Sequence, residues 1–144
     1  MRVVIQRVKE ASVSVNAEVI NEIKTGFMLL VSFTQTDTLE KTKKMAQKIA
    51  NIRIFPDENG VMNKSILDTG GSILSISQFT LYAETKKGNR PSYINALNGS
   101  EAIKLYEAFN EEMNTYVSTF PGVFGADMQV SLINDGPVTI LLEV

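Results

Sequence analysis

The chain has 144 residues, of which 44% are hydrophobic and 21% charged, so it has the length and composition of an ordinary globular protein with room for a buried core. It contains no histidine and no cysteine, which excludes disulfides, Ser-His-Asp and Cys-His hydrolases, and zinc sites built on those ligands. A formal net charge of −2 argues against a general nucleic-acid-binding protein, which usually carries a basic field, but leaves room for a local contact.

Two further absences narrow the class of protein. No apolar run reaches the roughly 18 residues of a membrane span, and residues 1–7 lack a signal-peptide core, so we expect a cytoplasmic protein without a membrane partner. The Asp and Glu residues are scattered and follow no calcium-loop pattern, so we expect no metal. Any catalysis must then depend on hydroxyls, carboxylates, lysines, backbone groups or the substrate itself.

The first part of the chain predicts a run of strands. Residues 3–8 form an apolar strand, and residues 11–15 alternate apolar and polar side chains as a half-buried strand does. Asn16-Ala17 is the expected turn into a return strand over residues 19–23. The almost uninterrupted apolar run over residues 26–33 is typical of a central strand.

Residues 39–52 predict a helix, because apolar side chains recur at the spacing of one helix face. A second face carries lysines, which form either a solvated surface or a small patch that contacts phosphates. The expected inward stripe consists of Leu39, Thr42, Met45, Ala46 and Ile49. The lysines are Lys41, Lys44 and Lys48, with Lys43 beside them.

The middle of the chain predicts short strands and turns. A strand over residues 52–55, a turn over residues 56–60 and a return strand over residues 61–66 come first. After a second turn at residues 68–71, residues 72–81 predict a long strand whose imperfect alternation indicates a bulge or burial on both faces.

The segment over residues 83–99 is rich in loop-forming residues. Lys86, Lys87 and Arg90 make it locally basic, and Tyr93 follows them. It is either a solvated loop or a flexible contact to an RNA end.

A second helix is predicted to begin at Ser100, which is a good helix cap, and to run to about residue 119. A turn at residues 122–125 and an alternating strand over residues 126–133 follow it. Strands with two principal helices predict one α+β domain over residues 1–144 with a mainly antiparallel, barrel-like sheet. The long apolar face of the helix consists of Ile103, Tyr106, Phe109, Met113, Tyr116, Val117 and Phe120.

Near the C-terminus, Asn134-Asp135-Gly136-Pro137 separates two strand-like runs over residues 128–133 and 138–144. Asp-Gly between such runs is a strong hairpin signal, but the proline removes a donor from the ladder and disfavours an ordinary hairpin. Two interpretations follow: a loop tip with a trans Gly-Pro bond, or a cis bond, which costs only about 0.5–1 kcal/mol before proline.

The segment Ser77-Gln78-Phe79-Thr80-Leu81, together with Asn134-Asp135-Gly136-Pro137-Val138-Thr139, resembles the two signature motifs of D-aminoacyl-tRNA deacylases. Either motif alone is weak, but both at the correct spacing are strong, and the resemblance spans the whole chain in order. Tyr93 stands where a phenylalanine is expected, which is a mild departure. Supporting matches are Gln6-Arg7-Val8, Ala11-Ser12-Val13, Met62-Asn63, Gly70-Gly71-Ser72, Gly88-Asn89-Arg90-Pro91-Ser92 and Phe124-Gly125-Ala126-Asp127-Met128.

The resemblance implies a homodimer of small α+β subunits with the active site at the subunit interface. It implies hydrolysis of the ester between a D-amino acid and the 3′ end of tRNA, without metal or cofactor. It also implies that Gly136-Pro137 is cis and enters the partner's site, where its main chain selects chirality. We expect tRNA and a second copy of the chain as partners, and no other protein partner.

The residues expected to be catalytic are Ser77, Gln78, Phe79 and Thr80. Backbone N–H groups around Phe79 and Thr80 are candidates to bind an oxyanion. Thr80 is an ordinary strand residue, a substrate-orienting residue or a nucleophile, and no base is evident to activate it. The terminal 2′-hydroxyl of the tRNA is another candidate to position or activate water. The expected substrate-binding residues are Asn134, Gly136, Pro137, Lys86, Lys87 and Arg90.

Two rival functions stay open on the residues alone. One is a non-catalytic module that binds RNA ends through Lys86, Lys87 and Arg90, although the acidic composition weighs against it. The other is an unrelated hydrolase that uses Thr80 on a small ester or amide.

Overall fold

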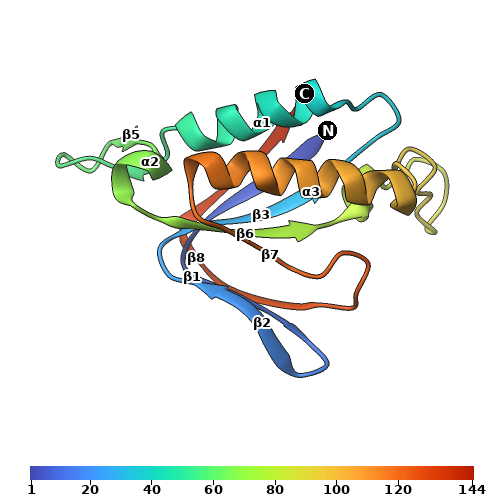
Figure 1. Ribbon diagram of the computed structural model, residues 1–144, viewed down its shortest axis with the longest axis horizontal. Helices are drawn as coiled ribbons and strands as arrows, with labels where there is room; N and C mark the ends of the chain where they lie inside the picture. The colour runs from blue at the N-terminus through green and yellow to red at the C-terminus, as the bar shows by residue number, and fades with distance from the viewer.

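The computed structural model describes all residues from 1 to 144, and a sheet built around one long strand dominates it (Figure 1). The two strands expected over residues 3–8 and 11–15 are one strand, β1, which pairs with β8 along its length. On its other side, β1 pairs with β3 through its first half and with β2 through its second half. The strands are β1 (Arg2–Val15), β2 (Glu18–Ile23), β3 (Gly26–Ser32), β4 (Phe55–Pro56), β5 (Met62–Lys64), β6 (Ser72–Ser77), β7 (Thr119–Pro121) and β8 (Gln129–Glu143).

The main sheet is mixed and nearly closes into a barrel. The pairs that involve β1 are antiparallel, whereas β3 with β6 and β6 with β7 are parallel. Each parallel pair is joined by a crossover that contains a helix, as parallel strands require. The edge strands β2 and β7 approach each other, and Asn21 Nδ2 donates a hydrogen bond of 2.6 Å to Pro121 O. The α+β, barrel-like fold class is confirmed, with a larger parallel part than the sequence predicted.

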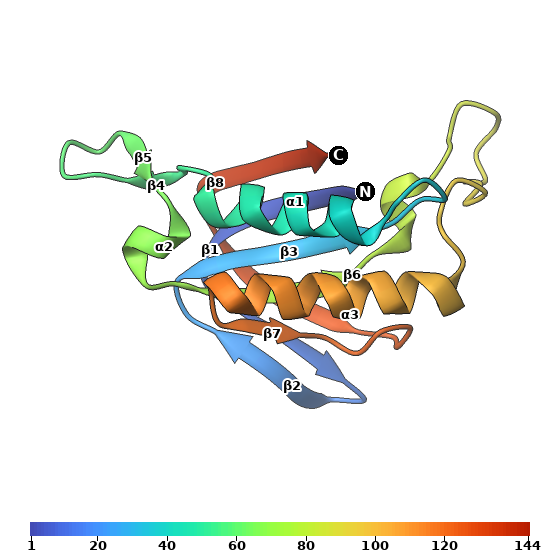
Figure 2. The ribbon, with the colours of Figure 1, turned by 45° about the horizontal axis from the view of Figure 1, so that its top comes forward.

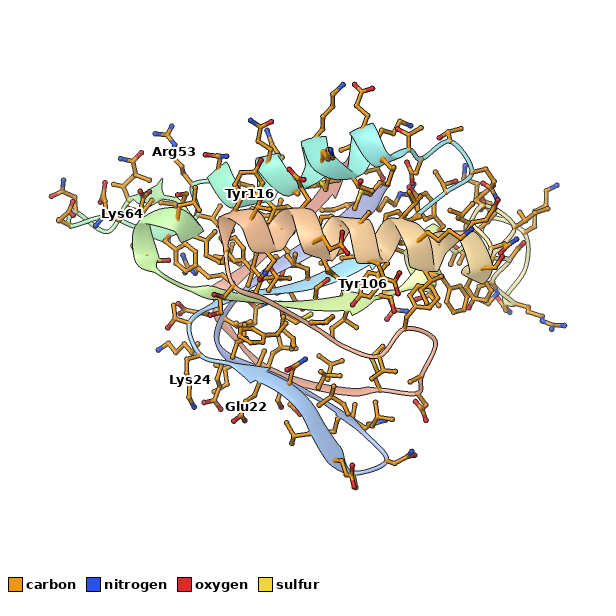
Figure 3. The ribbon with its side chains drawn as sticks, in the orientation of Figure 1. Glu22, Lys24, Arg53, Lys64, Tyr106 and Tyr116 are labelled. Carbon is orange, nitrogen blue, oxygen red and sulfur yellow. The ribbon has the colours of Figure 1, made fainter.

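Two principal helices lie side by side across one face of the sheet (Figures 1 and 2). Four of the five residues in the predicted stripe of the first helix are buried, but Leu39 is 57% exposed at its first turn. The second helix packs beside the first, and Tyr106 reaches down from it so that its hydroxyl donates to Ser75 O at 2.7 Å (Figure 3). Burial raises the pKa of Tyr106. The helices are α1 (Leu39–Asn51), α2 (Ile66–Thr69) and α3 (Gly99–Tyr116).

Several predicted boundaries are wrong for local reasons. The second principal helix is capped by Asn98 and not by Ser100, because Asn98 Oδ1 accepts from the N–H of Ser100 at 2.9 Å. That helix ends at Tyr116, and residues 119–121 join the sheet as β7. The turn expected at residues 68–71 overlaps the short helix α2, where Asp68 Oδ2 accepts from the N–H of Ser65 at 2.8 Å.

Two features decide the shape of the functional region. The long strand expected over residues 72–81 stops at Ser77, and a single 3-10 turn, η1 (Phe79–Tyr82), follows. The chain also does not reverse at Asn134-Asp135-Gly136-Pro137, because β8 continues through this segment from Gln129 to Glu143. A hairpin is absent because both flanking runs pair with the same neighbour, β1.

Candidate active site

A cavity of about 610 Å³ lies where the parallel strands β3 and β6 end. Segments 96–102 and 124–130 form its other walls. Of its 19 lining residues 12 are hydrophobic, so it suits an apolar side chain or a base better than a free ion. Its size is typical of small-molecule sites.

Three of the four residues predicted to be catalytic, Ser77, Gln78 and Phe79, line this cavity, whereas Thr80 does not. The main-chain N–H of Gln78 is used by β3, since it donates to Val31 O at 2.8 Å. No side chain and no carbonyl of a loop, turn or cap accepts a hydrogen bond from the N–H groups of Phe79 and Thr80. The start of η1 thus offers two adjacent, unused donors beside the cavity.

The Thr80 hydroxyl has one hydrogen-bond partner. Gln78 Nε2 donates to Thr80 Oγ1 at 2.5 Å. An amide donor cannot remove the proton of a hydroxyl, so this contact holds the side chain in place without activating it as a nucleophile.

The Gly136-Pro137 peptide bond is cis, as the family resemblance predicts. In the pairing of β8 with β1, Asn134 lies opposite Val8 and Thr139 lies opposite Gln6, so residues 135–138 all face one residue of β1. The segment therefore bulges out of the sheet, and Gly136 and Pro137 are exposed.

Asn134 closes the base of this bulge. Its Oδ1 accepts from the N–H of Val138 at 3.1 Å, and its Nδ2 donates to Thr139 Oγ1 at 2.9 Å. The amide predicted to bind substrate is thus occupied by the bulge itself.

Arg7 supports the bulge from below, and sequence reasoning assigned it no role. Its Nε donates to Asp135 O at 3.1 Å, and its Nη1 donates to Ile54 O at 2.6 Å. The side chain leaves no room above it, because a Cβ on Gly136 would lie 3.0 Å from Arg7 Nη2. The alternation of side chains along β1 already indicates that Arg7 faces the interior, since it follows the buried Val3 and Ile5 on the same face.

The two signature motifs lie far apart within one chain. Arg7, under the bulge, pairs with Phe27 on β3, and Phe27 pairs with Ile73 on β6. Ser77 is four residues further along β6, which corresponds to about 13 Å along the strand. Neither Gly136 nor Pro137 lines the cavity of its own chain.

The predicted RNA-contacting residues Lys86, Lys87 and Arg90 are exposed on a loop that projects beyond the end of α3 (Figure 2). Its base is closed by mutual main-chain hydrogen bonds of 2.8 and 3.0 Å between Glu84 and Ser92. No acidic side chain pairs with the three cations.

Phe79 and Tyr93 meet edge to face at the mouth of the cavity, with ring centres 5.0 Å apart. The basic loop, which lies between these two residues in the chain, is therefore anchored beside the cavity.

On the helix α1, two of the lysines pair with nearby carboxylates. Lys44 Nζ lies 2.8 Å from Glu40 Oε1, and Lys41 Nζ lies 3.7 Å from Asp37 Oδ1. These pairs favour a solvated helix surface over a phosphate site.

The model for the family described as D-Tyr-tRNA(Tyr) deacylase matches residues 4–143. The chain belongs to this deacylase family. A D-aminoacyl-tRNA deacylase of Lactobacillus gasseri is 54% identical to it, with 100% of both chains covered. The chain is accordingly an enzyme of the deacylase class, a hydrolase.

Two solved structures share the fold of this deacylase. One, described as c-Myc DNA Unwinding Element Binding Protein, is 40% identical with a TM-score of 0.95 and covers 100% of this chain and 99% of its own. The other, described as a probable eukaryotic D-amino acid tRNA deacylase, has a TM-score of 0.86 over 99% of this chain and 98% of its own. At 17% identity the second shows the fold alone.

Two kinds of feature are absent from the deacylase structure. No group of three or more histidine, cysteine, aspartate or glutamate side chains is placed to hold a metal ion. None of its helices combines the length and the apolar character needed to cross a membrane.

Proposed function

We propose that this enzyme hydrolyses the ester that joins a D-amino acid, or glycine, to the 3′ end of tRNA. The products are free tRNA and the amino acid. The observation that carries the proposal is the pair of unused N–H groups of Phe79 and Thr80 beside an apolar cavity. Family membership and the full-length relative of Lactobacillus gasseri support the substrate class. The whole chain, residues 1–144, forms the deacylase domain and acts in the cytoplasm.

The N–H groups of Phe79 and Thr80 bind the oxyanion that forms when water attacks the ester carbonyl. One such donor typically contributes about 2.7–4 kcal/mol to transition-state stabilisation. An aminoacyl ester is already reactive, so its hydrolysis needs only modest stabilisation beyond these two donors. The 2′-hydroxyl of the terminal ribose positions the attacking water, and such proximity contributes about 7–11 kcal/mol.

Ser77 and Gln78 orient the terminal nucleotide, and Gln78 also holds the Thr80 hydroxyl. Lys86, Lys87 and Arg90 contact the RNA backbone next to the cavity. All three side chains are exposed, and none of them forms an ion pair with a carboxylate, which supports this role.

Selection of chirality belongs to the main chain of Gly136 and Pro137. In the proposed geometry their carbonyls meet the α-amino group of the substrate, and a D-residue directs its side chain away from them. An L-residue with the same amino and ester placement directs its Cβ into those carbonyls. Glycine has no Cβ and escapes this rejection.

The enzyme acts as a homodimer in which Gly136-Pro137 of one subunit enters the cavity of the other. The separation of the bulge and the cavity within one chain supports this assembly. An exposed bulge supported by the buried Arg7 is a suitable element for insertion into a partner.

The decisive experiment compares turnover of D-tyrosyl-tRNA, glycyl-tRNA, L-tyrosyl-tRNA and the free ethyl ester of D-tyrosine. We expect the first two to be cleaved, the L-substrate to be spared and the free ester to react slowly. Binding of the tRNA without turnover would favour the RNA-end-binding module. Equal turnover of the free ester and the charged tRNA would favour an unrelated small-ester hydrolase.

A further inference from the structure

The four-residue turn η1 presents the proposed oxyanion donors, and it needs support from outside itself. Two main-chain hydrogen bonds join the turn to its flanking residues: Leu81 N donates to Gln78 O at 3.3 Å, and Ala83 N donates to Thr80 O at 3.0 Å. Ser32 Oγ lies 3.5 Å from Phe79 O, which is a long contact. Because the hydrogen bonds of a 3-10 turn have poorer geometry than those of an α-helix, a contact at the far end of η1 helps to fix its orientation.

Arg2 supplies that contact from the first residue of β1. Its Nη1 donates to Leu81 O at 2.8 Å, and its guanidinium carbon lies 4.5 Å from the centre of the Tyr82 ring. The planar guanidinium thus holds a carbonyl and an aromatic face of the same turn at once, which an ammonium cannot do with the same geometry. Burial raises the pKa of Tyr82 to about 12, so the ring that meets Arg2 stays neutral.

Glu143 orients the guanidinium. Arg2 and Glu143 are direct cross-strand partners of β1 and β8, and Arg2 Nε lies 2.6 Å from Glu143 Oε1. The two side chains are 35% and 55% exposed, and an exposed ion pair of this kind contributes little to folding stability. Its effect is therefore expected in the geometry of η1 more than in the stability of the fold.

From these contacts we propose that Arg2, oriented by Glu143, is a positioning residue that holds η1 so that the N–H groups of Phe79 and Thr80 point into the cavity. Neither Arg2 nor Glu143 lines the cavity, so the pair acts through the turn and not on the substrate. The inference rests on the proposed function, because it assigns the pair a part in binding the oxyanion.

The first test is the kinetics of Arg2→Met, which keeps the apolar stem and removes the donors and the charge. We expect kcat for D-tyrosyl-tRNA to fall about 10- to 100-fold, since a misplacement of about 1 Å can cost 100-fold, while KM stays within about twofold. Arg2→Lys should recover only part of kcat, because lysine restores the charge without the planar set of N–H donors. Glu143→Gln should lower kcat less than Arg2→Met does.

A matched control is Arg53→Met, which removes an exposed arginine at the opposite end of the molecule from η1 (Figure 3). It should leave kcat and KM unchanged. A folded Arg2→Met enzyme with wild-type kcat would overturn the proposal. A change in KM alone would overturn it too, because it would mark Arg2 as an RNA contact.

The second test does not depend on activity. In ¹H–¹⁵N spectra, Arg2→Met should shift the amide signals of Phe79 and Thr80, and Arg53→Met should leave them in place. Unshifted signals would contradict the positioning role even if the enzyme proved inactive on every tRNA ester. If the wild-type enzyme fails to cleave D-tyrosyl-tRNA but these signals shift, the proposed function fails and the support of η1 by Arg2 stands.

Discussion

At the residue scale, the hydrogen bond made by the Thr80 side chain disfavours one of its three candidate roles, that of nucleophile. Its hydroxyl accepts a hydrogen bond from the Gln78 amide, and no base lies beside it. A threonine nucleophile needs such a base to remove its proton. The unused main-chain donors next to it offer a different way to stabilise the transition state.

The first prediction follows from this contact. Thr80→Ala should lower kcat by less than about tenfold, far below the roughly 10⁶-fold loss that removal of a catalytic nucleophile causes. A D-tyrosyl-tRNA that ends in 2′-deoxyadenosine should be hydrolysed about 100-fold more slowly or worse, which is the usual effect of removing a positioned catalytic group. Single-turnover kinetics on D-tyrosyl-tRNA measures both. A folded, tRNA-binding Thr80→Ala enzyme without activity would restore the nucleophile hypothesis.

The second prediction concerns Gly136. Its φ of +125° is unfavourable for other residues, and an added Cβ would lie 3.0 Å from both Arg7 Nη2 and Val138 Cγ2. Gly136→Ala should therefore lower the free energy of unfolding by about 1–3 kcal/mol and reduce deacylation. Urea unfolding and kinetics check the two effects. The control is Gly60→Ala, at a glycine outside the cavity with a φ of +76° and no atom within 4 Å of the added Cβ; an equal loss of deacylation in both variants would contradict the argument.

At the element scale, hydrogen bonds between neighbouring residues decide where several elements begin and end. The short helix α2 begins where Asp68 accepts from both the N–H and the hydroxyl of Ser65, at 2.8 and 3.1 Å. These bonds favour the carboxylate, and they hold the pKa of Asp68 below its usual range. Local sequence signals missed this helix because it is only four residues long.

The third prediction is the pH dependence of this cap. A lowered folded-state pKa means that the carboxylate stabilises the fold above its unfolded pKa, and that this stability is lost as the pH falls through the folded pKa. Asp68→Asn should thus lower Tm at neutral pH, and its difference from wild type should shrink under acid. Calorimetry at several pH values tests this. Glu107→Gln, at an exposed carboxylate without an ion pair, should show no such trend.

At the scale of the whole molecule, the two signature motifs do not meet within one chain. Strand pairing places the bulge on the far side of β1 and β3, level with the start of β6, and the cavity at the end of β6. A two-fold dimer is the simplest assembly that brings them together, and such dimers are the commonest symmetric state.

The fourth prediction uses this separation. Gly136→Ala strains the bulge, and Phe79→Pro removes an N–H donor at the cavity. If each cavity takes the bulge of its partner, mixing these two impaired variants should raise activity above that of either one, to about a quarter of wild type if both are inactive alone, because half of the dimers are mixed and each has one intact site. Mixtures without recovery after subunit exchange would argue for sites within one subunit. An active monomer in the ultracentrifuge would exclude the dimer as well.

Much of the fold and of the site could be predicted from the sequence, because those parts depend on local patterns. The period of apolar residues located the helix α1 to within one residue at its end, and the apolar run located β3. The two signature motifs identified the family, which the matching model and the Lactobacillus gasseri relative confirm. Residue chemistry alone excluded imidazole and thiol mechanisms, since the chain has neither group.

The tertiary structure decided what depends on partners distant in the sequence. The Asp-Gly pair at positions 135 and 136 is a hairpin signal that the following proline weakens, and the pairing of β1 with both flanking runs keeps β8 continuous. Arg7 meets Ile54, and Arg2 meets Leu81 and Glu143, so the roles of both arginines lie in contacts that no local period encodes. The separation of bulge and cavity has the same cause, because sheet register is set by the packing of the whole chain and not by any one segment.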